Sequence, residues 1–327
     1  NQDGVAAARI ICDVHKSDGT PFEGCPRVAL KRVLAEAREM GYTMNIGTEA
    51  EFFLFEKNED GTHPRIGDIL RRTKNNVTNV SSTNHRNFTL LGDPALCLAY
   101  PKYNIILTDV QDSLQALGKV TISGKVVGNE GSVMSDFNGF VYPSVFDKKN
   151  TFQTLGQDQS PVLEIDLQKS LLFKGKSTVV NGQFTFSFVV PKDINYSYGE
   201  GKVSLYAEGS TESEDFTDAA GYNLDIIIGG TADDYEEDIE GPQVELFMND
   251  TNFIFGGLTD ESPSLLAVLF DDNGINTVGN GIGHDMVAVL DETSNNPIVL
   301  NDFYESDVDS YQSGKVLYPF AMLSEGN

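Results

Sequence analysis

Residues 183–190 read Gln-Phe-Thr-Phe-Ser-Phe-Val-Val, and residues 119–127 read Lys-Val-Thr-Ile-Ser-Gly-Lys-Val-Val. They belong to a series of short runs of β-branched and aromatic residues that Gly, Asn and Asp separate at fairly regular spacing, with no helical period between them. This pattern is typical of β-sandwiches. The other runs of the series are 139–146, 202–208, 223–228, 244–248, 265–270 and 286–290.

We interpret these runs as two Ig-like β-sandwiches, at residues 113–230 and 243–327, and we expect the second to be incomplete. The first is close to the common domain size of about 100–150 residues, so it should fold alone. Residues 231–242 read Thr-Ala-Asp-Asp-Tyr-Glu-Glu-Asp-Ile-Glu-Gly-Pro. Clustered like charges and the Gly-Pro stop predict an acidic linker there.

The composition is strongly acidic, with 23 Lys and Arg against 49 Asp and Glu and a net charge of −26. Such a charge repels a phosphate backbone, so we expect no nucleic-acid partner. No apolar run approaches the roughly eighteen residues of a membrane-spanning helix, so we expect no direct membrane insertion. Three cysteines are too few and too scattered for a disulfide framework.

Residues 1–64 have a different pattern, which predicts strand, helix, strand. Apolar residues in 26–40 recur at helical spacing between charged ones, and Gly41 follows as a C-terminal cap. Strand-like runs lie on either side, at 8–14 and 44–55.

Glu49 and Glu51 are two residues apart in the second of these runs, so alternation places both carboxylates on one strand face. Such a pair can bind Mg²⁺ or Mn²⁺, because these ions prefer hard oxygen ligands. The alternative is a solvated strand face that carries two glutamates by chance. The β-sandwiches themselves require no cofactor.

Three motifs mark residues 4–62: Asp-Gly-Thr-Pro-Phe-Glu-Gly at 18–24, Pro-Arg at the helix start, and Gly-Thr-Glu-Ala-Glu-Phe-Phe-Leu-Phe at 47–55. Together they resemble the stretch where bacterial type I glutamine synthetase enters its catalytic domain. The resemblance implies that Glu49 and Glu51 are ligands of the two catalytic metal ions. The family's further metal ligands, Gly-rich segment and arginines do not follow, so we expect no ligase activity.

Other motifs follow from residue 66 to the end, among them Leu-Leu-Gly-Asp-Pro-Ala-Leu at 90–96, Gly-Phe-Val-Tyr-Pro-Ser-Val-Phe-Asp at 139–147 and Gly-Pro-Gln-Val-Glu-Leu-Phe-Met-Asn-Asp at 241–250. They resemble the sortase of the Bacteroidetes type IX secretion system, a gingipain-like cysteine peptidase. On this resemblance residues 65–112 are the end of the peptidase domain. The fold class is then mainly β, with Ig-like sandwiches after the remnants of two α/β domains.

This second resemblance implies a parent activity that cleaves the C-terminal signal domain from secreted cargo and attaches the cargo to the cell surface. The catalytic His and Cys of that family precede the matched region, so we assign no catalytic residue and expect no turnover by this chain alone. Expected partners are secreted cargo proteins or other secretion-system components, at the cell surface or outer membrane. If the synthetase-like part determines where the protein acts, the expected location is the cytoplasm instead.

Two further clusters have alternative interpretations. Cys97, twelve residues after His85, could be a nucleophile, but its apolar run, Ala-Leu-Cys-Leu-Ala at 95–99, favours a core cysteine. The Asp-Asp-Asn-Gly sequence at 271–274 could bind Ca²⁺, whereas turn chemistry explains the same residues.

The two resemblances meet within residues 57–66, and we interpret the chain as a chimera, either misassembled or a genuine fusion. Three functions stay open: an enzyme, a docking module, and a structural support for a catalytic domain outside this chain. We expect residues 1–62 to be loosely held, because about 60 residues bury too little surface for independent stability.

Overall fold

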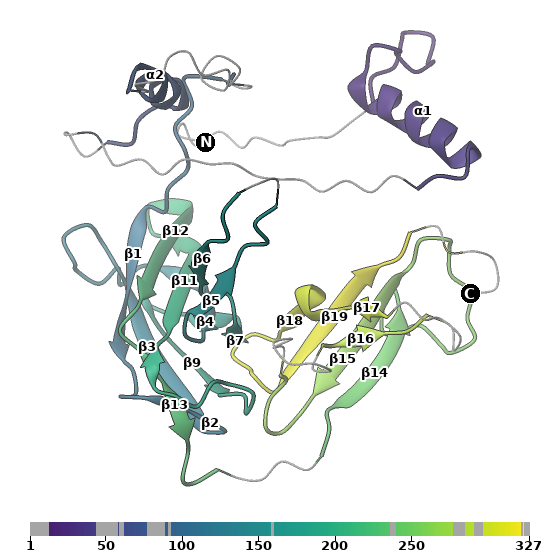
Figure 1. Ribbon diagram of the computed structural model, residues 1–327. Coiled ribbons are helices and arrows are strands. Elements are labelled where there is room, and N and C mark those ends of the chain that lie inside the picture. Colours follow the sequence, from purple (N-terminus) through teal and green to yellow (C-terminus); the bar gives the residue numbers. More distant parts are fainter. Residues whose placement is uncertain are drawn as a thin grey trace. The chain divides into compact units, whose positions relative to one another are not determined.

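The computed structural model describes residues 13–43, 58, 62–76, 89–90, 93–157, 160–235, 240–276, 285–290, 297–321 and 323. It divides into two compact units, Asn1–Leu98 and Ala99–Asn327. Figure 1 shows that the described part of the first unit contains helices, whereas strands dominate the second. The expectation of a mainly β protein is confirmed.

The first unit contains helix α1 (Pro26–Glu39) and helix α2 (Ile66–Asn76). Pro26 opens α1 at a position where a missing N–H costs nothing, and Gly41 follows it with a φ of 82°. The predicted helix is therefore confirmed to within one residue. No side chain of α1 is buried. Most of the predicted strand at 8–14 and all of the one at 44–55 lie outside the described residues.

An eight-stranded sheet forms the centre of the second unit, in the order β7-β4-β11-β12-β1-β3-β9, with β8 also paired to β4. Neighbouring strands are antiparallel except β1 and β12, which run parallel. The strands are β1 (Tyr103–Asp109), β3 (Lys119–Val127), β4 (Asn138–Phe146), β7 (Leu171–Lys174), β8 (Ser177–Val179), β9 (Gln183–Val189), β11 (Lys202–Thr211) and β12 (Glu214–Asn223).

A three-stranded sheet, β10 (Gly199–Glu200), β13 (Ile227–Thr231) and β2 (Leu114–Ala116), contributes Leu114 and Ile228 to the core of the eight-stranded sheet. On β9 every second residue, Phe184, Phe186 and Phe188, is buried in that core. Each buried Phe contributes about 1.5–3 kcal/mol through removal of its apolar surface from water. The period of two in this run thus decides which face of the sheet becomes the core.

A four-stranded sheet follows, in the order β14-β15-β19-β18. Its core contains Ala267, Leu269, Leu300, Tyr304 and Val316. Two small two-stranded sheets, β5 with β6 and β16 with β17, complete the described strands. The bounds are β14 (Gln243–Met248), β15 (Ser264–Phe270), β18 (Tyr304–Ser306), β19 (Ser313–Pro319), β5 (Asn150–Gln153), β6 (Glu164–Leu167), β16 (Val287–Ala288) and β17 (Ile298–Val299), with a 3₁₀ turn η1 (Asn301–Phe303) before β18.

Most predicted runs coincide with strands, but several details differ. The run at 286–290 contains only the two-residue strand β16. The eight-stranded sheet includes β1, which precedes residue 113. The run at 223–228 is split between β12 and β13. The predicted linker at 231–242 begins inside the fold, because Ala232 is buried and its N–H donates to the carbonyl of Ala116. Among the described helices, none has the length and apolar character to cross a membrane.

Candidate functional site

A cavity of about 180 Å³ lies in the second unit where the turn between β18 and β19 meets the eight-stranded sheet. Residues of β3, β7, β8 and β9 line it together with residues of the turn. Its lining mixes cationic, hydroxyl and aromatic groups: Lys119, Lys176, Thr185, Ser187, Asp309 and Tyr311.

Asp309 fixes the turn that lines this cavity. Its carboxylate accepts hydrogen bonds from the backbone N–H of Thr178 at 2.7 Å and from the Thr178 hydroxyl at 2.6 Å. The N–H of Asp309 donates to the carbonyl of Lys176 at 2.9 Å, and Val308 forms a parallel β-bridge with Lys176. Backbone and side-chain bonds therefore join the four-stranded sheet directly to the eight-stranded one.

The two lysines of the cavity lie over aromatic rings. The Lys119 ammonium is 5.3 Å from the ring centre of Tyr311, and that of Lys176 is 4.4 Å from the ring of Phe140 and 5.3 Å from that of Tyr142. Such cation–π contacts contribute about 0.5–1 kcal/mol each at exposed sites.

Burial, with a hydrogen bond from its hydroxyl to Glu208, raises the pKa of Tyr142 to about 12. The cavity thus offers charge and hydrogen-bond recognition.

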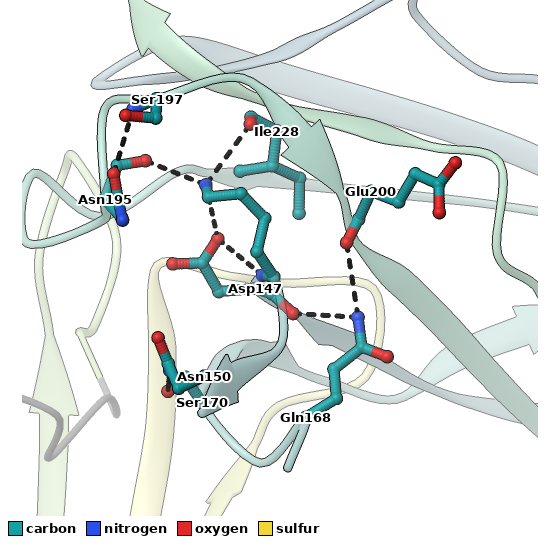
Figure 2. A network of polar contacts seen from close by, with 9 residues as sticks. Asp147, Asn150, Gln168, Ser170, Asn195, Ser197, Glu200 and Ile228 are labelled. Carbon is teal, nitrogen blue, oxygen red and sulfur yellow. Dashed lines mark hydrogen bonds and ion pairs between the residues drawn. The ribbon is translucent and has the colours of Figure 1, made fainter. Parts of the chain in front are cut away.

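A second polar cluster ties the end of β4 to the surrounding loops (Figure 2). The ammonium of Lys148 lies 2.8 Å from a carboxylate oxygen of Asp147 and donates to the carbonyls of Asn195 at 2.8 Å and Ile228 at 3.2 Å. Gln168 donates its side-chain N–H to the carbonyl of Asp147 at 2.9 Å. Only 13% of the Lys148 side chain and 10% of the Asp147 side chain are exposed. This nearly buried ion pair holds the β4 end, the loop before β10 and β13 in one arrangement.

The residues that the sequence singled out are dispersed. Glu49, Glu51 and His85 lie outside the described residues. Cys97 is half-buried, and its thiol donates to the backbone carbonyl of His63 at 3.6 Å, so the expectation of a fully buried core cysteine is only partly met. Within the described ranges no group of three His, Cys, Asp or Glu could hold a metal ion.

Asp271 adopts the turn role that the sequence offered as the alternative to Ca²⁺ binding. Its carboxylate accepts the backbone N–H of Asn273 at 2.8 Å, and its carbonyl accepts that of Gly274 at 3.1 Å. Gly274 has a φ of 104°, a backbone conformation that favours glycine. The Asp-Asp-Asn-Gly sequence therefore forms a turn.

Sequence reasoning missed the groups that the structure brings together. Lys148 and Lys149 are adjacent in sequence, but only Lys148 is withdrawn from solvent. Asp309 and Thr178 are 131 residues apart. Neither pairing has a local signal in the sequence, because both depend on how distant strands pack.

Comparison with known proteins agrees with a composite chain. The glutamine synthetase catalytic domain matches residues 23–96. The glutamine synthetase of Clostridium saccharobutylicum is 68% identical to this chain over 54 residues. That of Staphylococcus aureus is 62% identical to this chain over 55 residues. The matched part is 16% of this chain and 12% of either enzyme.

A solved structure, dimeric latent PorU from Porphyromonas gingivalis, matches with 31% sequence identity and a TM-score of 0.45. The match covers 83% of this chain and 26% of the PorU chain. This chain therefore resembles glutamine synthetase in one part and PorU in another. It spans about an eighth of the synthetases and about a quarter of PorU. The synthetase match extends beyond residue 64, into the segment whose motifs resemble the peptidase.

Proposed function

We propose that the chain acts mainly as a non-catalytic docking module, the C-terminal part of a type IX secretion sortase-like cysteine peptidase. In this role its β unit binds secreted cargo or other secretion-system components at the cell surface. The observation that carries the proposal is the direct joining of the two β parts. Asp309 and Val308 fix the four-stranded sheet to Thr178 and Lys176 of the first sandwich.

A docking surface works best on a rigid base, because less conformational freedom is lost on binding. The base here is the aromatic and aliphatic core of the eight-stranded sheet, to which the Lys148 cluster adds polar ties. The joined four-stranded sheet ends in the edge strand β14, and an edge strand presents unpaired backbone groups to a partner. Cleavage and attachment of cargo belong, on the sortase resemblance, to residues that precede the matched region.

Binding of the full chain to a purified C-terminal signal domain from a type IX cargo protein tests the proposal. Isothermal titration calorimetry should give saturable binding, and an unrelated folded domain of similar size and charge serves as the control. Absence of heat and of co-purification would overturn docking. Peptidase turnover of the same cargo by the full chain, lost in Cys97→Ser, would overturn the non-catalytic assignment.

The 68% identity to a glutamine synthetase favours a second candidate for the first unit. In this candidate Glu49 and Glu51 bind Mg²⁺ or Mn²⁺ in the cytoplasm. Both residues lie outside the described ranges, so no geometry or further ligand is assigned. Calorimetric titration of the full chain with Mn²⁺ tests it. Binding should disappear in Glu49→Gln/Glu51→Gln and persist in Glu36→Gln/Glu39→Gln, which makes the same charge change on α1.

A further inference from the structure

Strand β14 (Gln243–Met248) lies at the edge of the four-stranded sheet and pairs with β15 on one side. The ladder between them continues to Asn249, whose N–H donates to the carbonyl of Ser264 at 2.7 Å. Because hydrogen-bonded and non-hydrogen-bonded positions alternate in an antiparallel pair, the N–H groups of Val244 and Leu246 point away from β15. No described strand pairs with the other side of β14, so among the described residues this open side offers backbone donors at a spacing of two residues.

Two side chains of β14 are apolar and exposed although they lie on the core face of the sheet. Val244 is opposite Leu269, and Leu246 is opposite Ala267. Directly paired residues share a face, and both partners are buried in the core. Yet Val244 is 51% exposed and Leu246 is 64% exposed. The residues that cover this face of the sheet therefore bury the side chains of β15 but leave those of β14 exposed.

The sequence that forms this edge is acidic, and the cation of the sheet that shares a face with Glu245, Lys315, lies two strands away on β19. Between Lys202 and Lys315 the sequence contains no Lys or Arg, although it contains many Asp and Glu residues. Glu245 is exposed at the middle of β14 and lies on the face opposite Val244 and Leu246. A partner strand at this edge meets apolar side chains on one face and a carboxylate on the other. A second copy of a chain with a net charge of −26 is repelled.

We propose that the open edge of β14 binds an extended segment of a partner protein that alternates apolar and basic residues. The segment adds a strand to the sheet, as in other cases of β-augmentation. Its backbone pairs with Val244 and Leu246, its apolar side chains cover those two residues, and its Lys or Arg side chains face Glu245. The inference rests on the proposed docking function and names the surface and the partner chemistry.

The probe is a labelled decapeptide of alternating Val and Lys, titrated into the full chain and followed by fluorescence anisotropy. A peptide of the same composition, with all Val residues before all Lys residues, controls for non-specific attraction to an acidic protein. The alternating peptide should bind at least about tenfold more tightly, because only it covers one face with apolar groups while it pairs by its backbone.

Three variants locate the site. Val244→Pro removes an outward N–H without loss of a ladder bond, and should weaken binding of the alternating peptide about tenfold. Glu245→Lys should weaken it several-fold in low salt, by an amount on the order of one exposed ion pair. Glu130→Lys makes the same charge change at an exposed loop position of the first sandwich and should leave affinity unchanged.

Equal affinities for the two peptides, or equal effects of Glu245→Lys and Glu130→Lys, would overturn the proposal. So would concentration-dependent dimerisation that Val244→Pro abolishes, because the edge would then bind a second copy. If the alternating peptide does not bind but the cargo signal domain does, the docking function stands and only the proposed site at the edge of β14 is rejected. Failure of both removes the docking function as well.

Discussion

Lys148→Met tests whether the buried ion pair stabilises the fold of the eight-stranded sheet. The substitution keeps most of the side-chain volume and removes the ammonium that lies 2.8 Å from Asp147. The Asp147 carboxylate then stays nearly buried without its cation. The carbonyls of Asn195 and Ile228 also lose a donor.

Removal of one partner of a buried ion pair costs about 3–5 kcal/mol, because the other charge stays desolvated. Only 13% of the Lys148 side chain and 10% of the Asp147 side chain are exposed, so solvent screens the pair little. We therefore expect Lys148→Met to lower the free energy of unfolding by at least about 3 kcal/mol. The free energy of unfolding is measured by urea titration, followed by circular dichroism of the β signal. Lys149→Met, at the exposed neighbour, is the matched control and should change stability by less than about 0.5 kcal/mol.

The double variant Asp147→Leu/Lys148→Met separates charge from packing. It removes both charges, so it should recover a substantial part of the loss seen in Lys148→Met. A buried ion pair that stabilises the fold is refuted if Lys148→Met lowers the free energy of unfolding no more than Lys149→Met does. It is also refuted if the double variant is less stable than Lys148→Met, because the pair itself would then not carry the effect.

Three other outcomes are expected. Asp309→Ala removes the carboxylate that accepts both hydrogen bonds of Thr178. Hydrogen exchange at the Thr178 amide should therefore accelerate by a factor corresponding to about 1–2 kcal/mol. The control Asp302→Ala should leave this rate unchanged, and equal rates in the two variants would contradict the joining role of Asp309. The folded pKa of Tyr142, about 12, exceeds that of an exposed Tyr, so its contribution to stability is fully present below about pH 10 and is lost as pH rises toward 12. Tyr142→Phe should flatten that alkaline decline in urea titrations, and an unchanged slope would assign the decline to other groups. Limited proteolysis should cut residues 1–62 before the eight-stranded sheet, since no side chain of α1 is buried; earlier cuts within that sheet would contradict this.

The β part could be predicted from the sequence because its runs carry their own period. Phe184, Phe186 and Phe188 alternate with polar residues, so the run indicates both a strand and its buried face. Pro26 and Gly41 likewise mark the ends of α1 by their backbone preferences. These signals are local, so no knowledge of distant partners is needed.

Strand order and the polar clusters could not be predicted in this way. Tyr103 pairs with Ala219 in a parallel ladder, and no feature near either residue specifies the other. The burial of Lys148 beside the exposed Lys149 follows from loops that close over only one of them. The two glutamates that the sequence favoured as metal ligands, Glu49 and Glu51, lie outside the described residues and stay a prediction.

Hydrogen exchange of the full chain, with and without a purified cargo signal domain, tests the central claim most directly. Docking by addition of a strand should slow exchange of the Val244 and Leu246 amides, which point to the open side of β14. Amides of β11, which is paired on both sides within the eight-stranded sheet, should exchange at the same rate in both samples. Unchanged exchange across residues 243–248 at saturating signal domain would contradict the account.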